Sequence, residues 1–159
     1  GRVEPVPTDG DYSIFIDYAV TPDAIENVLT TLRGIAPKRL VMLFGAGGDR
    51  DRKKRPIMGK LSADIADFVI VTSDNPRTED PMSIIEEILP GVRAGKAPYK
   101  VICDRPEAIR WAIDHHEPGD VILLCGKGHE DYQIIGHEKI HMDEREIVAD
   151  YLAERAKRT

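Results

Sequence analysis

The 159-residue sequence lacks the features that mark disulfide-rich, membrane-spanning and nucleic-acid-binding proteins. Its two cysteines, Cys103 and Cys125, have no metal-ligand spacing, and we expect them as reduced thiols of a cytoplasmic protein. No apolar run approaches the ~20 residues of a membrane span. The net charge of −6 argues against a nucleic-acid groove or an anionic membrane surface, which need clustered positive charge. We therefore expect neither nucleic acid nor a membrane as a partner.

The residues that are present, 42% hydrophobic and 31% charged, are typical of one globular domain. Apolar runs alternate with helical periodicities, and glycine and proline separate them. They predict strands at 13–17, 39–44, 67–72, 99–103 and 120–125, helices at 22–32, 56–66, 80–89, 105–116 and 143–156, and a hairpin at 132–135 and 138–141. Residues 1–11 are expected to be irregular and to end in a turn. This order predicts an α/β fold, a Rossmann-like three-layer sandwich whose mostly parallel sheet is followed by a C-terminal hairpin or antiparallel strand.

A polar loop, Asp74-Asn75-Pro76-Arg77, follows one of the buried strands. The strand should stop near Ser73, because Asn75 does not suit a strand interior and Pro76 cannot donate to a ladder. Arg77 then emerges at the carboxyl end of a parallel strand, where ligands bind in open α/β sheets. Its guanidinium group is well shaped to hold a carboxylate. We therefore expect this loop to bind an acidic or zwitterionic small molecule.

Two more loops with glycine and charge follow predicted strands, at 45–54 and at 126–130. The first has Arg50 where the dinucleotide fingerprint needs its third glycine. The second has Val121 and Gly128 where a Walker loop needs a glycine and a serine or threonine. Neither nucleotide motif is therefore predicted. Each loop alone could be a solvated turn, but three such loops at one sheet edge favour a ligand-binding site.

The charged side chains of these loops leave two interpretations open. Glu130 could pair with an ammonium group of a ligand, as Arg50 and Arg77 could with carboxylates. Alternatively, Lys127 and Glu130 form a surface ion pair and His129 has no role. The histidines lack metal-ligand spacing, and no nucleophile arrangement with serine or cysteine is supported. We therefore predict no catalytic residue and no metal ligand in this chain.

Six ordered motifs resemble the C-terminal domain of the Mur ligases, of the MurE type that adds the third peptide residue of peptidoglycan. They are Gly1-Arg2-Val3-Glu4, Asp17-Tyr18-Ala19-Val20-Thr21-Pro22-Asp23-Ala24, residues 44–51, Lys54-Arg55-Pro56, Asp74-Asn75-Pro76-Arg77, and residues 126–130 with Tyr132-Gln133. The resemblance covers essentially the whole chain, and it departs at Val20, where the family usually has histidine. In this family the Asp-Asn-Pro-Arg motif is the signature for meso-diaminopimelate.

The resemblance implies a set of residues that bind meso-diaminopimelate. Its members are Arg50, Asp74, Asn75, Pro76, Arg77, Gly126 and Glu130. Within this set, Arg50, Asn75 and Arg77 would bind one carboxylate. Gly126 and Glu130 would bind the distal carboxylate and ammonium end.

For ATP, the resemblance implies contacts from Arg2 and Asp17 on the ribose and phosphate side, with residues 18–21 alongside. ATP and magnesium would be bound mainly by a central ATPase domain, and the UDP-MurNAc-dipeptide by that domain and an N-terminal UDP-binding domain. Residues 1–159 contain neither domain, so the isolated chain is expected to be inactive as a ligase. A free-standing nucleotide-binding module and a purely structural α/β module are the alternatives.

Overall fold

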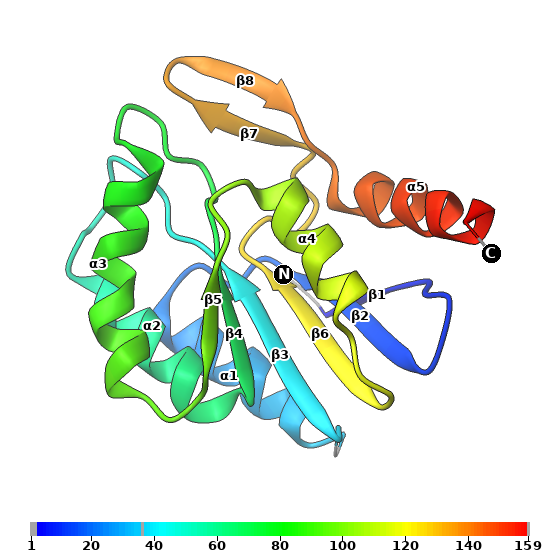
Figure 1. Ribbon diagram of the computed structural model, residues 1–159. Coiled ribbons are helices and arrows are strands. Elements are labelled where there is room, and N and C mark those ends of the chain that lie inside the picture. Colours follow the sequence, from blue (N-terminus) through cyan, green and yellow to red (C-terminus); the bar gives the residue numbers. More distant parts are fainter. Residues whose placement is uncertain (1–2, 36, 159) are drawn as a thin grey trace.

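The computed structural model describes residues 3–35 and 37–158 (Figure 1). Within these residues, six strands form one sheet in the order β1-β2-β6-β3-β4-β5, and two more form a separate hairpin. The strands are β1 (Glu4–Val6), β2 (Tyr12–Asp17), β3 (Arg39–Phe44), β4 (Phe68–Val71), β5 (Tyr99–Val101), β6 (Asp120–Cys125), β7 (Tyr132–Ile135) and β8 (Glu138–His141). The helices are α1 (Pro22–Arg33), α2 (Lys54–Ile65), α3 (Pro81–Ala94), α4 (Arg105–Asp114) and α5 (Glu144–Lys157).

The sheet is parallel except at β1, and β6 lies at its centre. Strand β6 pairs in parallel with β2 on one side and with β3 on the other, and β3, β4 and β5 continue the sheet. All residues of β6 are buried, because helices cover both faces of the sheet. Helices α1, α2 and α3 pack on one face, and α4 and α5 pack on the other (Figure 1). The predicted α/β class, with three layers, a mostly parallel sheet and a C-terminal hairpin, is confirmed.

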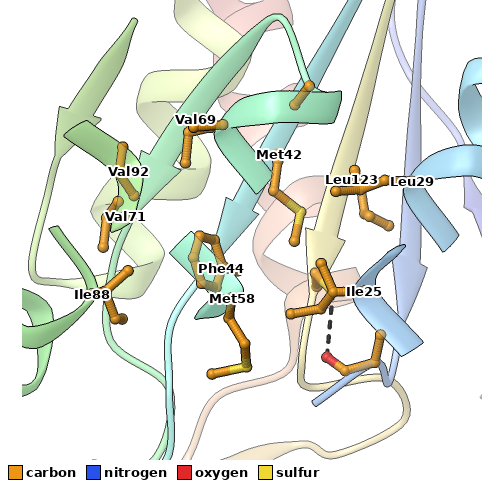
Figure 2. Packing of buried hydrophobic residues seen from close by; sticks show 14 of the residues in the cluster. Ile25, Leu29, Met42, Phe44, Met58, Val69, Val71, Ile88, Val92 and Leu123 are labelled. Carbon is orange, nitrogen blue, oxygen red and sulfur yellow. Dashed lines mark hydrogen bonds between the residues drawn. The ribbon is translucent and has the colours of Figure 1, made fainter. Parts of the chain in front are cut away.

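Helix α1 shows how the local sequence places an element against the sheet. Thr21 caps the helix, since its hydroxyl oxygen accepts a hydrogen bond from Ala24 N at 3.2 Å. Ile25 and Leu29 then recur on one face and are buried. They belong to the same apolar cluster as Leu123 of β6 (Figure 2). The amphipathic pattern therefore fixes which side of α1 faces the core.

Strand β1 lies in the segment for which no strand was predicted, so that prediction is wrong. The strand pairs antiparallel with β2, with Glu4 opposite Ile16 and Pro5 opposite Phe15. Proline discouraged the assignment because it removes a ladder donor. An edge strand tolerates that loss, since one of its sides has no partner strand.

Helix α3 also corrects the sequence prediction, which ended it near Leu89. The structure continues the helix through Pro90. Val92 extends the buried apolar face, and Gly91 lets α3 lie directly against α2. A Cβ atom at Gly91 would come within 1.8 Å of the Pro56 carbonyl oxygen. Tertiary packing therefore outweighs the local cost of the proline.

The two cysteines are free thiols, as predicted. Burial raises the pKa of both Cys103 and Cys125. In the described part of the chain, no helix combines the length and the apolar character that crossing a membrane requires.

Candidate functional site

A cavity of about 340 Å³ opens among the loops that follow β2, β3, β4 and β6. Six of the seven residues predicted to bind substrate line it: Arg50, Asp74, Asn75, Arg77, Gly126 and Glu130. Pro76 is the exception. It is buried, and a Cβ atom on Gly48 would come within 1.8 Å of its carbonyl oxygen. The structure thus brings the three loops together, and the binding role of these residues stays a prediction.

Two hydrogen bonds to backbone carbonyls hold the loop after β3 against the loop after β4. Gly48 N donates to the Asn75 carbonyl oxygen at 2.8 Å, and Arg77 Nη1 donates to the Gly48 carbonyl oxygen at 2.9 Å. Glycine is needed at position 48 because the Pro76 carbonyl fills the place of a side chain. Within the described residues, only Nη1 of the Arg77 guanidinium has a protein acceptor. Its other nitrogens are therefore available to a ligand at the cavity wall.

The β7–β8 hairpin fixes the backbone of Arg77 from another direction. Arg77 has φ +53°, which is uncommon for a residue other than glycine. Its N–H donates to the Ile134 carbonyl at 3.0 Å, and its own carbonyl accepts from Gly136 N at 2.6 Å. Figure 1 shows the hairpin beyond the carboxyl edge of the main sheet. These bonds tie the hairpin to the loop and hold Arg77 in its uncommon conformation.

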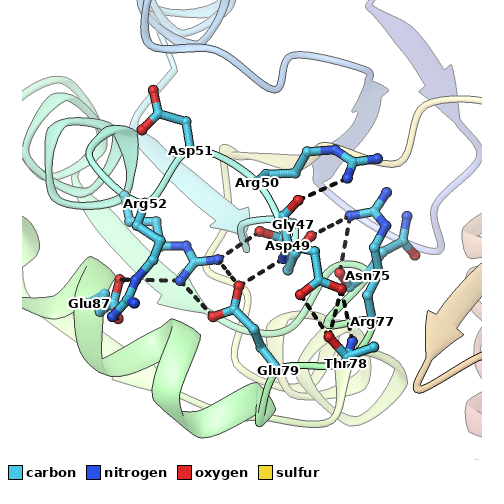
Figure 3. A network of polar contacts seen from close by, with 12 residues as sticks. Gly47, Asp49, Arg50, Asp51, Arg52, Asn75, Arg77, Thr78, Glu79 and Glu87 are labelled. Carbon is cyan, nitrogen blue, oxygen red and sulfur yellow. Dashed lines mark hydrogen bonds and ion pairs between the residues drawn. The ribbon is translucent and has the colours of Figure 1, made fainter.

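A network of charged groups joins the loop after β3 to the loop after β4 (Figure 3). Arg55, which is 1% exposed, donates to both oxygens of Glu79 at 2.8 and 3.0 Å and to the Gly47 carbonyl at 3.0 Å. The bonds from Arg55 and from Asp49 N lower the pKa of Glu79 to about 2. Asp49 also accepts from Thr78 Oγ1 at 2.7 Å. The two loops that carry the predicted arginines are therefore cross-linked.

Lys127 is fully buried next to residues that line the cavity. Its Nζ donates to Asn75 Oδ1 at 2.7 Å and pairs with Glu130 Oε1 at 2.9 Å. It also lies 3.4 Å from Asp74 Oδ1 and 5.1 Å from the centre of the Tyr132 ring. The ion pair between Lys127 and Glu130 therefore exists, but the expectation that it lies on the surface is wrong.

Asp74 places a second carboxylate beside the cavity. Burial raises the pKa of Asp74, while the charges of Arg105 and Lys127 act in the opposite direction. Its Oδ1 has no hydrogen-bond partner in the described protein, because the 3.4 Å contact with Lys127 is an ion pair without hydrogen-bond geometry. Gly126 has φ +113° and no side chain to cover Asp74 Oδ2. A Cβ atom on residue 126 would come within 3.3 Å of that oxygen. Asp74 can therefore accept hydrogen bonds from an ammonium group in the cavity.

A third buried cation, Arg105 of α4, joins the site to helix α5. Arg105 Nε donates to Glu144 Oε2 at 2.8 Å, and both side chains are fully buried. Its Nη1 and Nη2 donate to the carbonyls of Ser73 and Cys125 at 3.0 and 2.9 Å. These two residues lie just before the loops that carry the candidate ligand-binding groups. Arg105 therefore holds the ends of β4 and β6 in a fixed relation.

Asp17, which was predicted to contact ATP, lies apart from this cavity, whereas Tyr18, Val20 and Thr21, predicted alongside it, line the cavity. Asp17 accepts a hydrogen bond from Ala19 N at 3.0 Å and lines a separate hollow of about 320 Å³ with Asn27 and Thr31. These groups suit ribose hydroxyls, but the described residues that line the hollow include no lysine or arginine for phosphates. Arg2 lies outside the described residues. Within residues 3–35 and 37–158, no group of three or more His, Cys, Asp or Glu residues is placed to hold a metal ion.

Sequence reasoning did not predict that the cations of the site are buried. It named Lys127 in the loop at 126–130 but expected its ion pair on the surface, and Arg55 occurred only in a motif of the family resemblance. Arg105 had no such signal, because it opens a helix like many surface arginines. Their importance becomes visible only when their distant partners are known.

Comparison with known proteins agrees with this geometry. The family model described as "Mur ligase, glutamate ligase domain" matches residues 1–128. A curated UDP-N-acetylmuramoyl-L-alanyl-D-glutamate--2,6-diaminopimelate ligase from Caldanaerobacter subterraneus subsp. tengcongensis is 54% identical over 99% of this chain and 33% of its own length. The ligase of the same name from Trichormus variabilis is 55% identical, over 99% and 32% of the two chains.

A solved structure of a ligase with that name has the same fold. It superimposes with a TM-score of 0.90 at 39% identity, and the match covers 98% of this chain and 32% of that one. The chain thus spans about a third of the length of these relatives. On the agreement of sequence and fold, the chain belongs to the Mur ligase family, in which it matches the glutamate ligase domain.

Proposed function

We propose that residues 1–159 form the C-terminal, amino-acid-binding domain of an ATP-dependent ligase of peptidoglycan synthesis. That ligase adds meso-diaminopimelate to UDP-MurNAc-L-Ala-D-Glu. The names of the similar ligases support this assignment. In this proposal the UDP-binding and ATPase domains are other parts of a longer protein, and the isolated chain does not catalyse the reaction.

The observation that carries the proposal is that positively and negatively charged side chains line the same cavity. Arg50 and Arg77 suit carboxylates, and Asp74 and Glu130 suit ammonium groups. Meso-diaminopimelate has two carboxylates and two ammonium groups, so it complements both kinds of side chain. Lysine lacks the second carboxylate, and each buried donor left without a partner costs about 1–3 kcal/mol. The cavity therefore favours diaminopimelate over lysine.

The contribution of this domain to the reaction is the positioning of the attacking amine. Holding the amino acid in one orientation removes much of the entropic cost of bringing two substrates together. ATP supplies the activation of the acceptor carboxylate, and in this proposal Asp17, which lines the separate hollow, contacts its ribose. Closure of this domain over the nucleotide would bring the bound amino acid to that carboxylate.

The test is Arg77→Lys in the full-length ligase. Lysine keeps the positive charge but loses the planar fork that binds a carboxylate with two bonds. We expect kcat/KM for meso-diaminopimelate to fall by about 10- to 100-fold, because a hydrogen bond to a charged group is worth ~1.5–3 kcal/mol. With free lysine as the substrate, kcat/KM should fall less, so that discrimination between the two amino acids decreases.

Arg110→Lys is the matched control, because Arg110 is an exposed arginine of α4 that does not line the cavity. We expect it to leave both substrates unaffected. Unchanged discrimination in Arg77→Lys would overturn the assignment of Arg77 to the substrate carboxylate. A wild-type enzyme that incorporates an amino acid other than diaminopimelate would overturn the proposed function itself.

A further inference from the structure

Lys127 contacts three of the groups assigned to the amino acid although it does not itself line the cavity. Its fully buried ammonium group lies 2.7 Å from Asn75 Oδ1, 2.9 Å from Glu130 Oε1 and 3.4 Å from Asp74 Oδ1. Two of these partners belong to the loop after β4 and the third to the loop after β6. The ammonium group therefore lies at the junction of the two loops.

The contact with Asn75 decides which end of its side-chain amide is available to a ligand. Asn75 Oδ1 accepts from Lys127 Nζ and also from Ile134 N at 3.0 Å. Both partners can only donate, so a reversed amide would place its NH₂ group against two donors. In the described part of the chain no acceptor binds Asn75 Nδ2, and Asn75 lines the cavity. The fixed orientation thus reserves a hydrogen-bond donor for a ligand.

The ion pair of Lys127 with Glu130 fixes the position of a hydrogen-bond acceptor, the Glu130 carboxylate, in a similar way. Glu130 Oε1 pairs with Lys127 Nζ, and its Oε2 accepts from the Tyr132 hydroxyl at 3.2 Å. Each oxygen therefore has a protein partner, and a carboxylate offers about four lone-pair sites in all, so capacity for a ligand remains. The Glu130 carboxylate is held from the protein side and keeps acceptor capacity toward the cavity.

We propose that Lys127 is a positioning residue for the amino-acid substrate of the ligase. Through Asn75 it directs a hydrogen-bond donor toward a substrate carboxylate, and through Glu130 it places an acceptor for a substrate ammonium group. This inference rests on the proposed function, because it assigns the contents of the cavity to an amino acid. It differs from a purely structural role, which would affect folding without selecting one substrate.

The first experiment is Lys127→Met in the full-length ligase, since methionine fills a similar volume without a charge or a donor. We expect the KM for meso-diaminopimelate to rise by about 10- to 100-fold, as expected when a charged hydrogen-bonding group is lost. The KM values for ATP and for the UDP-linked substrate should stay within about threefold, because the proposed function assigns this cluster to the amino acid alone. A purely structural role would instead lower the amount of active enzyme and leave all KM values unchanged.

Lys139→Met is the matched control. Lys139 lies 4.1 Å from the centre of the same Tyr132 ring but is exposed on β8. Its replacement therefore removes a neighbouring cation without touching Asn75 or Glu130, and we expect all KM values to be those of the wild type. A Lys127→Met enzyme with the same KM for the amino acid as this control would overturn the proposal.

A second variant, Asn75→Asp, tests the same inference if Lys127→Met does not fold. Aspartate keeps an acceptor for Lys127 and Ile134 but replaces the Nδ2 donor by an oxygen. We expect an increased KM for meso-diaminopimelate. Where Lys127→Met does fold, adding it to Asn75→Asp should raise the KM by a smaller factor than Lys127→Met does in the wild-type background, because part of the effect of Lys127 passes through the same amide. A wild-type KM in Asn75→Asp would overturn the proposal.

The failure of this inference can be told apart from the failure of the proposed function. If the wild-type enzyme uses an amino acid other than diaminopimelate, the proposed function is wrong, and the KM comparison is made with the amino acid that is used. If diaminopimelate is the substrate and both variants keep the wild-type KM, only the role of Lys127 is wrong.

Discussion

The apolar core under α1–α3 and the carboxyl edge of the same sheet are stabilised in different ways. In the core, Leu29, Met42 and Ile88 are fully buried among other apolar side chains (Figure 2), and each contributes through the area it removes from water. At the edge, Lys127 and Arg105 are just as buried, but each satisfies several oxygen atoms. Core contacts are many and interchangeable, whereas edge contacts are few and specific.

This difference has a physical cause. A buried charge is costly unless it is paired and hydrogen-bonded, so its partners must be in place at the same time. The gain is a fixed geometry of polar groups at the site where a ligand is expected to bind. Substitutions in the two regions should therefore separate stability from substrate recognition.

The largest effect is expected from Arg105→Ala. The substitution leaves Glu144 as a buried carboxylate without its cation and removes the donors to the carbonyls of Ser73 and Cys125. We expect the free energy of unfolding to fall by about 3–5 kcal/mol, measured by urea denaturation. A loss below about 1 kcal/mol would show that the edge does not depend on this pair.

A double variant, Arg105→Met with Glu144→Leu, sharpens this test. Replacing both charges by apolar side chains leaves no uncompensated ion, so most of the lost stability should return. The carbonyls of Ser73 and Cys125 still lack their donors, so the KM of the full-length enzyme for the amino acid should be higher than in the wild type, although stability returns. A double variant as unstable as Arg105→Ala would mean that the unpaired charge is not the cause of the loss.

An intermediate effect is expected from Leu29→Ala in the core. Removing a fully buried leucine side chain should lower the free energy of unfolding by about 3 kcal/mol, through lost burial and the cavity left behind. The KM for the amino acid should not change, because Leu29 belongs to the core cluster and does not line the cavity.

Ile57→Ala is the control for the core, since Ile57 is 51% exposed on α2. Its effect on stability should be no more than about 0.5 kcal/mol, as for most surface substitutions. An increased KM in Leu29→Ala would contradict the separation of the two regions, because a core defect would then reach the site.

The sequence predicts the core better than the edge because core information is local. Ile25, Val28, Leu29 and Leu32 recur at helical spacing, so one short window shows both the helix and its buried face. The apolar run of β6 predicts a buried central strand in the same way. The largest errors in predicting these elements were at prolines, in β1 and at Pro90, where neighbouring elements override local preference.

The edge depends on pairs that are distant in sequence. Lys127 and Asn75 are 52 residues apart, and Arg105 and Glu144 are 39 residues apart, so no window contains both partners. The rule that parallel strands end at one edge predicts that the three loops meet. It does not predict that Lys127 is buried, because a lysine between two glycines is usually solvated.

The smallest expected effect, and the one that depends most on pH, comes from Glu79→Gln. The two hydrogen bonds from Arg55 lower the pKa of Glu79 to about 2 from an ordinary value of 4.5. The ionised carboxylate therefore stabilises the fold above the ordinary pKa, and this contribution is lost as the pH falls from there through about 2. At pH 7 the variant should be less stable by about 1 kcal/mol, because the partly exposed carboxylate is screened by solvent.

Denaturation of the wild type and Glu79→Gln at several pH values between 7 and 2 tests this assignment. Glu86→Gln is the control, because Glu86 is an exposed glutamate of the following helix, α3. The stability difference between wild type and Glu79→Gln should shrink with acid and vanish near pH 2, whereas Glu86→Gln should match the wild type throughout. If the stability difference between wild type and Glu79→Gln persisted at pH 2, the lost stability would come from packing, as in the core, and not from the charge of Glu79. Because Leu29→Ala removes no titrating group, its stability loss should not depend on pH, so acid alone would distinguish the charged edge from the apolar core.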